Sequence, residues 1–153
     1  MRLTTMTDFA LRLLMYVGNQ PHRLCTISEV SAAYGISEAH LMKVTHQLGL
    51  HGWIKTLRGK GGGMRLAHAP SEINLGAVVR SIEPDFALVE CFATGSKCVL
   101  TGRCQLSSML EGAIQAFMEH LNRHSLADLL PTTDLSMLNG RPMKLVSRKL
   151  QLK

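Results

Sequence analysis

The chain has 153 residues and a mass of 16.8 kDa, which fits one domain with at most an added dimerisation element. Hydrophobic residues make up 46% and charged residues 18%, so a packed core is available and global disorder is not expected. The net charge of +6 divides into +5 over residues 1–68, −3 over 69–130 and +4 over 131–153, so a polyanion is expected to meet the N-terminal part. The first 25 residues hold charged side chains and no long apolar run, which predicts a cytoplasmic protein without an export signal or membrane span.

Residues 8–18 are predicted to form the first amphipathic helix. Phe9, Leu13 and Val17 repeat at helical spacing. Thr7 is expected to cap this helix, and Asp8 stands in its first turn, where the helix dipole favours a carboxylate.

Residues 27–51 predict two helices joined by a tight turn at Gly35. Ile36 is expected beneath the turn, and Ser37 is expected to cap the second helix, whose inward positions are Leu41, Val44 and Leu48. In a helix-turn-helix the second helix enters a DNA major groove, and this interpretation is favoured over a plain helical hairpin.

The candidate DNA-contacting residues lie on two neighbouring segments. The second helix presents Ser37, His40, Lys43 and Gln47 outward, although an ordinary solvated helix face has the same appearance. Residues 53–68 predict a short hairpin with a glycine-rich tip at 58–63, without the spacing of a phosphate-binding loop. A basic hairpin after a helix-turn-helix is typical of a wing, with Arg58 and Lys60 against phosphates or the minor groove.

The second half of the chain predicts helices over residues 71–83 and 105–123, and a short one over 125–130. The apolar stripe of the 105–123 helix includes Leu110, Ile114 and Phe117 and is expected to pair with a second copy. Residues 131–153 show no consistent period and are predicted to form a flexible basic tail, which leaves residues 1–130 as the folded domain. The expected fold is mainly α: a winged helix-turn-helix DNA-binding domain with a long dimerisation helix.

Three of the four cysteines, Cys91, Cys98 and Cys104, are spaced C-x6-C-x5-C in the loop 91–104. Their spacing is not that of a zinc ribbon, and iron–sulfur clusters accept thiolates from longer loops. An iron–sulfur cluster is therefore favoured over a reactive-thiol sensor, a zinc site or inert buried thiols. Cys25 stands apart and is expected to be a small buried hydrophobic residue.

The sequence resembles the iron–sulfur winged-helix repressors, and within them the nitric-oxide-sensing NsrR type. The segments that carry the resemblance are 1–4, 7–12, 40–44, 58–63 and the three loop cysteines, and it covers about residues 1–130. It implies a homodimer on an inverted-repeat operator, with one [2Fe-2S] or [4Fe-4S] cluster per subunit. The implied cluster ligands are Cys91, Cys98 and Cys104, with Asp8 from the partner subunit as the fourth.

The fourth ligand and the signal have alternatives. Water, Ser107, His120 or a small thiol could replace Asp8, which is otherwise only a partner of the helix dipole. The resemblance implies a repressor that releases DNA when nitric oxide attacks the cluster. An IscR-like regulator of iron–sulfur status or redox is the alternative, although Ser107 stands where that type has a histidine. Electron transfer would leave the wing without a role, and no set of catalytic groups indicates an enzyme.

Overall fold

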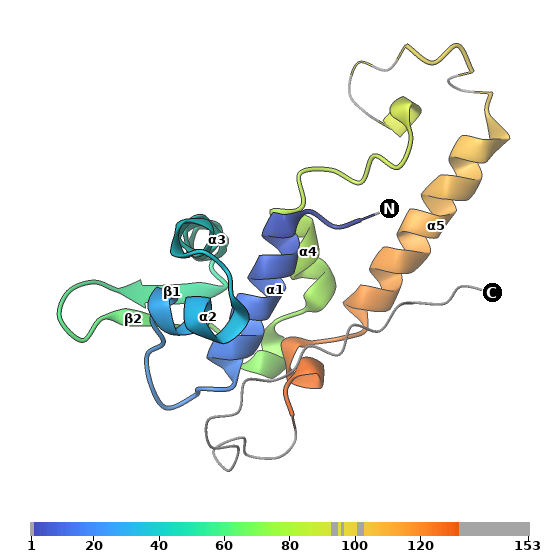
Figure 1. Ribbon diagram of the computed structural model, residues 1–153. Helices are drawn as coiled ribbons and strands as arrows, with labels where there is room; N and C mark the ends of the chain where they lie inside the picture. The colour runs from blue at the N-terminus through green and yellow to red at the C-terminus, as the bar shows by residue number, and fades with distance from the viewer. Residues whose placement is uncertain (1, 93–94, 96, 101–102, 132–153) are drawn as a thin grey trace.

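The computed structural model describes residues 2–92, 95, 97–100 and 103–131, and the prediction of a flexible tail over 131–153 lies outside these residues except for Pro131. Figure 1 shows a helical head from which a loop rises and returns as one long helix. The head contains α1 (Thr5–Gly18), α2 (Ile27–Tyr34), α3 (Glu38–Leu50), β1 (Ile54–Leu57), β2 (Gly63–Leu66) and α4 (Leu75–Ile82). The long helix is α5 (Gln105–Asn122), and short 3-10 turns cover Pro70–Glu72, Glu90–Phe92 and Leu126–Leu129.

Helix α1 begins one turn earlier than the sequence predicts. Thr4, not Thr7, is the capping residue, and its side chain accepts a hydrogen bond from the Thr7 amide. Thr7 is fully buried inside the first turn, where its hydroxyl donates to the carboxylate of Glu83 at the end of α4. The buried face of the rest of α1 consists of Ala10, Leu13, Leu14 and Val17.

The helix-turn-helix forms as predicted because each local signal agrees with the others. Thr26 and Glu29 form a capping box at the start of α2, and Gly35 ends that helix with a φ of 66°. Ile36 is 5% exposed beneath the turn, and Ser37 caps α3. The inward residues of α3 are buried at the three predicted positions, Leu41, Val44 and Leu48.

The predicted hairpin is the antiparallel pair of β1 and β2, in which Ile54 faces Leu66 and Leu57 faces Gly63. Cys25 forms an isolated antiparallel bridge to β2, because its backbone exchanges two hydrogen bonds with that of Met64. Cys25 is fully buried, which confirms its predicted role as a core residue. The hairpin is also tied to α4, since the Trp53 indole donates to Ser81 Oγ over 2.9 Å.

The helix predicted from residue 71 begins only at Leu75, because Asn74 caps α4 through the Ala77 amide and Pro70–Glu72 forms a separate turn. Helix α5 ends at Asn122, one residue before the predicted end. Hydrogen bonds hold this C-terminal end of α5 against the start of α4. Asn74 Nδ2 donates to the Asn122 carbonyl over 2.6 Å, and the Leu75 amide donates to the His124 carbonyl. The fold is therefore a winged helix-turn-helix with an attached long helix, as predicted. Among the described helices, none is long and apolar enough to cross a membrane.

Candidate DNA interface and cysteine loop

The predicted DNA-reading residues occupy the outer face of α3, but two of them also have structural contacts. Ser37 Oγ caps the His40 amide and lies 2.8 Å from His40 Nδ1. The His40 ring lies with its centre 6.0 Å from that of Phe9 on α1. Lys43 is exposed and Gln47 half-buried one turn later, so these two are the freer candidates for base or phosphate contacts.

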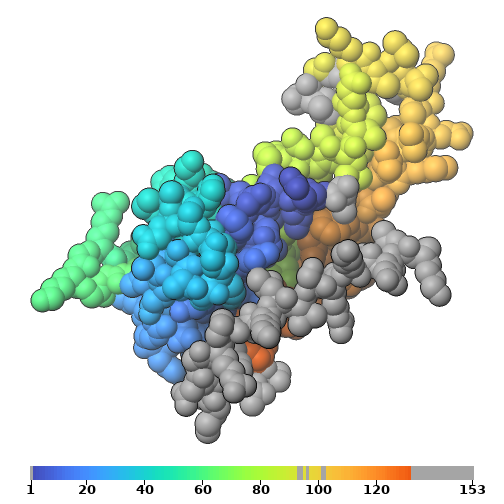
Figure 2. All heavy atoms as spheres, viewed as in Figure 1, coloured from blue at the N-terminus to red at the C-terminus, as the bar shows by residue number. Residues whose placement is uncertain are grey.

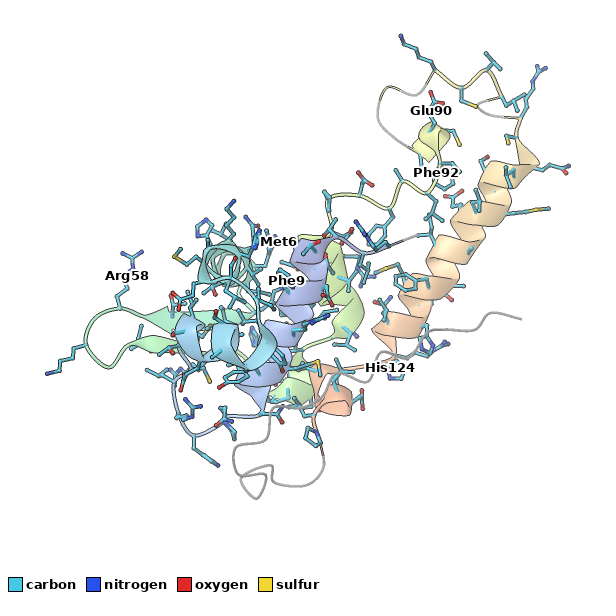
Figure 3. The ribbon with its side chains drawn as sticks, viewed as in Figure 1. Met6, Phe9, Arg58, Glu90, Phe92 and His124 are labelled. Atoms are coloured by element: carbon cyan, nitrogen blue, oxygen red, sulfur yellow. The ribbon has the colours of Figure 1, made fainter. Side chains whose placement is uncertain are left out.

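At the wing tip Arg58 points to solvent, away from the body of the protein (Figure 3), and Lys60 is also exposed. Its glycines are structurally required, because Gly59 and Gly61 have φ values of 98° and 79°. A side chain at Gly62 would overlap the carbonyl of Leu57. The tip is thus a tightly turned backbone that carries two cations and little else.

A second pair of wing cations was not among the predicted contacts. Lys55 and Arg65 face each other across β1 and β2, both are exposed, and neither forms an ion pair within the described part of the chain. Like charges at directly opposed positions destabilise a sheet, so an anion beside them would relieve the repulsion. The alternation of the hairpin, with buried Ile54 and Met64 on the other face, is the sequence signal that places both cations outward.

The cysteine loop lies at the opposite end of the molecule from the wing (Figure 2). Cys91 stands in the 3-10 turn Glu90–Phe92, Cys104 immediately precedes α5, and Cys98 lies between them. All three are half-buried. The described residues contain no group of three or more histidine, cysteine or acidic side chains close enough to hold a metal ion.

The three thiols nevertheless match an iron–sulfur cluster in their chemistry. Soft thiolates are the ligands such clusters take, and all three come from one loop. Cys104 occupies the capping position of α5, whose first turn contains no acidic side chain. Cys104 therefore stands at the positive end of the helix dipole.

The structure restricts the predicted fourth ligands. Ser107 donates its hydroxyl hydrogen to the Cys104 carbonyl over 2.6 Å, so it serves the start of α5. His120 lies 16 residues beyond Cys104 on the same helix, or roughly 24 Å along its axis, and cannot reach the loop of its own chain. The prediction of His120 as an alternative ligand is therefore wrong within one subunit.

Asp8 is half-exposed on α1 and bound to Arg12 of the same chain. Arg12 Nη2 lies 2.9 Å from Asp8 Oδ2, and Arg12 Nε donates to Oδ1 over 3.1 Å. A hollow of about 360 Å³ adjoins this carboxylate, lined by Arg2, Leu3, Thr5, Asp8 and Leu11. Asp8 therefore has an internal partner and also open space beside it.

Helix α5 exposes an apolar row toward solvent. Leu106 is 60% and Met109 70% exposed, and Gly112, Ala113 and Ala116 continue the row with small side chains. The residues predicted for the dimer interface, Leu110, Ile114 and Phe117, are half-buried instead. Ile114 and Phe117 line a hollow of about 340 Å³ against the N-terminal segment and the linker after α4. The most exposed apolar row of α5 therefore passes through Met109, one residue before the predicted Leu110.

Comparison with known proteins gives one consistent result. Residues 3–132 match the Rrf2 family, described as iron-dependent transcriptional regulators. The chain is 48% identical to the HTH-type transcriptional regulator NsrR of Geobacillus kaustophilus, over 85% of this chain and 90% of that one. It is 42% identical to NsrR of Bacillus subtilis over the same shares of the two chains.

Solved structures support the fold. CymR, the global cysteine regulator of B. subtilis, superposes with a TM-score of 0.70 at 21% identity, over 88% of this chain and 99% of that one. IscR of T. potens superposes with a TM-score of 0.66 at 21% identity, over 84% and 85% of the two chains.

Proposed function

The chain belongs to the Rrf2 family of DNA-binding transcriptional regulators, and we propose that it is a homodimeric repressor that senses nitric oxide through an iron–sulfur cluster. The observation that carries this proposal is the placement of three half-buried loop thiols, Cys91, Cys98 and Cys104, at the start of an exposed apolar helix. A DNA-reading head with a basic wing lies at the other end of the molecule.

DNA binding would combine the outer face of α3 with the wing. Lys43 and Gln47 would contact base edges or nearby phosphates, while Arg58 and Lys60, both exposed, would contact phosphates or the minor groove. Lys55 and Arg65 lie on the other face of the hairpin, beside the end of α1, and would add phosphate contacts only if the DNA backbone also reaches that face. Each cation that contacts a phosphate releases counterions, so each contributes to the salt dependence of binding in the same way.

The salt dependence of DNA affinity tests this assignment. Replacing Arg58 or Lys60 with alanine should flatten the slope of log affinity against log salt by about 1 for each. Lys55→Gln and Arg65→Gln should have the same effect if the strand face also meets the backbone. Gln47→Ala should instead relax base preference. Unchanged slopes in all four charge variants would show that the hairpin does not touch DNA.

The dimer would form through α5. A row that begins with Leu106 and Met109 and continues through Gly112, Ala113 and Ala116 lets a second helix approach closely, and burying it removes the largest exposed apolar side chains of the helix from water. A two-fold dimer presents two α3 helices to an inverted repeat.

The three loop cysteines would hold the cluster in each subunit. Asp8 of the partner subunit would complete the ligand set, because its carboxylate is half-exposed beside an open hollow and need only leave Arg12. When bound, an iron–sulfur cluster supplies iron that reacts with nitric oxide. Asp8 would then return to Arg12, which frees α1 of one subunit from the loop of the other and alters the spacing of the two α3 helices. Half-sites one helical turn apart tolerate little change in spacing.

Anaerobic titration with nitric oxide tests the sensing step. Operator binding, followed by fluorescence anisotropy, should fall together with the cluster absorbance. Cys91→Ala, Cys98→Ala and Cys104→Ala should each lose iron and sulfide, whereas Cys25→Ala should keep both, because Cys25 is fully buried in the head. If the absorbance bleaches while the anisotropy stays constant, the cluster does not control DNA binding.

A further inference from the structure

Glu83 joins the end of α4 to the start of α1. Its carboxylate accepts hydrogen bonds from the Thr4 amide over 3.0 Å, from the Thr4 hydroxyl over 3.1 Å and from the Thr7 hydroxyl. Thr7 is fully buried, and Thr4 is the capping residue of α1. One carboxylate thus satisfies donors in the first turn of a helix about 80 positions away in sequence, where the dipole favours a negative charge.

The same turn of α1 leads directly to the recognition helix. Phe9, half-buried and less than one turn beyond Thr7, packs its ring against that of His40, with the ring centres 6.0 Å apart and the planes inclined by 59°. His40 stands in the first turn of α3, and its Nδ1 lies 2.8 Å from the capping Ser37 Oγ. Contacts therefore run without a gap from Glu83 through α1 to the start of α3.

The other side of Glu83 is the linker to the cysteine loop. Pro84 follows Glu83, and the chain then rises past Phe86 and Leu88 to Cys91. Figure 1 shows this linker leaving the head beside the N-terminal end of α1, and Figure 3 shows Phe9 on the part of α1 near α3. Glu83 is the residue of the head to which the linker is directly joined, so a displacement of the linker would act on it.

We propose that Glu83 and Phe9 are positioning residues, which set the start of the recognition helix from the segment that carries the cysteine loop. Glu83 fixes the axial position of α1 through Thr4 and Thr7, and Phe9 transfers that position to His40. This inference rests on the DNA-binding part of the proposed function and not on the cluster. Within one subunit, a change at the cysteine loop would reach the recognition helix through Glu83, α1 and Phe9.

The primary test is the NMR spectrum of cluster-free protein. The ring protons of His40 experience the ring current of Phe9, so Phe9→Leu should shift them. Glu83→Gln should shift the same protons although Glu83 does not contact His40, because the amide cannot accept all the hydrogen bonds that the carboxylate accepts. Asp85→Asn is the matched control: it removes a charge from the same linker, at a residue that accepts a hydrogen bond from the Ala87 amide. Unmoved His40 resonances in folded Glu83→Gln would overturn the proposal.

Operator affinity gives a second readout. Glu83→Gln should weaken specific binding roughly tenfold, a typical size for coupling between sites, while binding to random DNA and the salt slope stay unchanged. Equal loss on both DNAs would contradict a positioning role. Thr7→Val, which deletes only one donor to Glu83, repeats both measurements if Glu83→Gln does not fold. Because no cluster is needed, loss of nitric oxide response in the wild type would disprove the sensing proposal and leave this one standing.

Discussion

The head and α5 bury their apolar residues in opposite ways. In the head, residues from α1, α3, the hairpin and α4 share one core, in which Leu13, Leu14, Leu41 and Val78 are fully inaccessible to solvent. In α5 only Met118 is buried, while Leu106 and Met109 are mostly exposed. A single chain therefore completes the head but not the arm formed by α5 and the cysteine loop. Under the proposed function, DNA recognition would then be built within one chain and regulation between two.

The largest effect is expected from a charge on the exposed apolar row of α5, which tests whether a second chain covers that row. Met109→Asp should weaken the dimer by about 3–5 kcal/mol, because an unpaired carboxylate would be buried at the interface. Sedimentation should then show monomers whose far-ultraviolet circular dichroism is unchanged. Gln115→Asp, at an exposed position about 120° around α5 from Met109, is the control and should remain dimeric. A dimeric Met109→Asp protein would place the interface elsewhere.

A cavity in the head should lower the stability of the folded chain itself, whereas the charge at Met109 should affect only the dimer. Leu13→Ala removes fully buried atoms and should lower the free energy of unfolding by about 2–5 kcal/mol, as measured by urea denaturation. Leu106→Ala, which truncates an exposed side chain, should change the stability of a monomeric background by less than about 0.5 kcal/mol. Equal losses would mean that α5 is part of the head's core.

The contact between α4 of the head and the end of α5 is tested by substituting Gly76, with Gly112 in the middle of α5 as the comparison. A methyl group at Gly76 would overlap Asn122 Oδ1 and lie 3.1 Å from the Asn122 backbone nitrogen, so Gly76→Ala should cost about 1–3 kcal/mol and loosen α5. Gly112 has no atom within 4 Å of such a methyl group. Gly112→Ala should therefore stabilise the monomeric helix by up to about 1 kcal/mol, yet weaken a dimer whose helices cross there. Thermal unfolding at several protein concentrations separates the two effects.

The head was easier to predict from sequence than the arm. Gly35, Ser37 and the spacing of Leu41, Val44 and Leu48 are local signals, and all of them agree with the structure. The start of α1 was misplaced because Thr7 is buried by Glu83, a partner that no local pattern reveals. The half-burial of Ile114 and Phe117 was missed for a similar reason: the linker after α4 lines a hollow with both residues, and helical periodicity alone cannot show this.

The cysteines also differ between the two regions: Cys25 is buried in the head, whereas Cys91, Cys98 and Cys104 are half-buried in the cysteine loop. Burial raises the pKa of the Cys25 thiol, so the native state keeps a proton that the unfolded chain loses at high pH. Stability should therefore fall as the pH rises above the ordinary thiol pKa, and Cys25→Ala should remove that part of the slope. Iodoacetamide at pH 8 should label Cys91, Cys98 and Cys104 of cluster-free protein before Cys25, as read by mass spectrometry. Early labelling of Cys25 would mean that the head opens readily.

The claim that regulation is built between two chains is tested most directly with mixed dimers. One chain carries Asp8→Ala and intact cysteines, and the other carries Cys91→Ala and an intact Asp8. If Asp8 serves the partner's loop, each mixed dimer holds one complete site and shows half of the wild-type cluster absorbance, with wild-type shape. A mixed dimer whose spectrum matches the Asp8→Ala homodimer would contradict this account, as would an Asp8→Ala homodimer indistinguishable from the wild type.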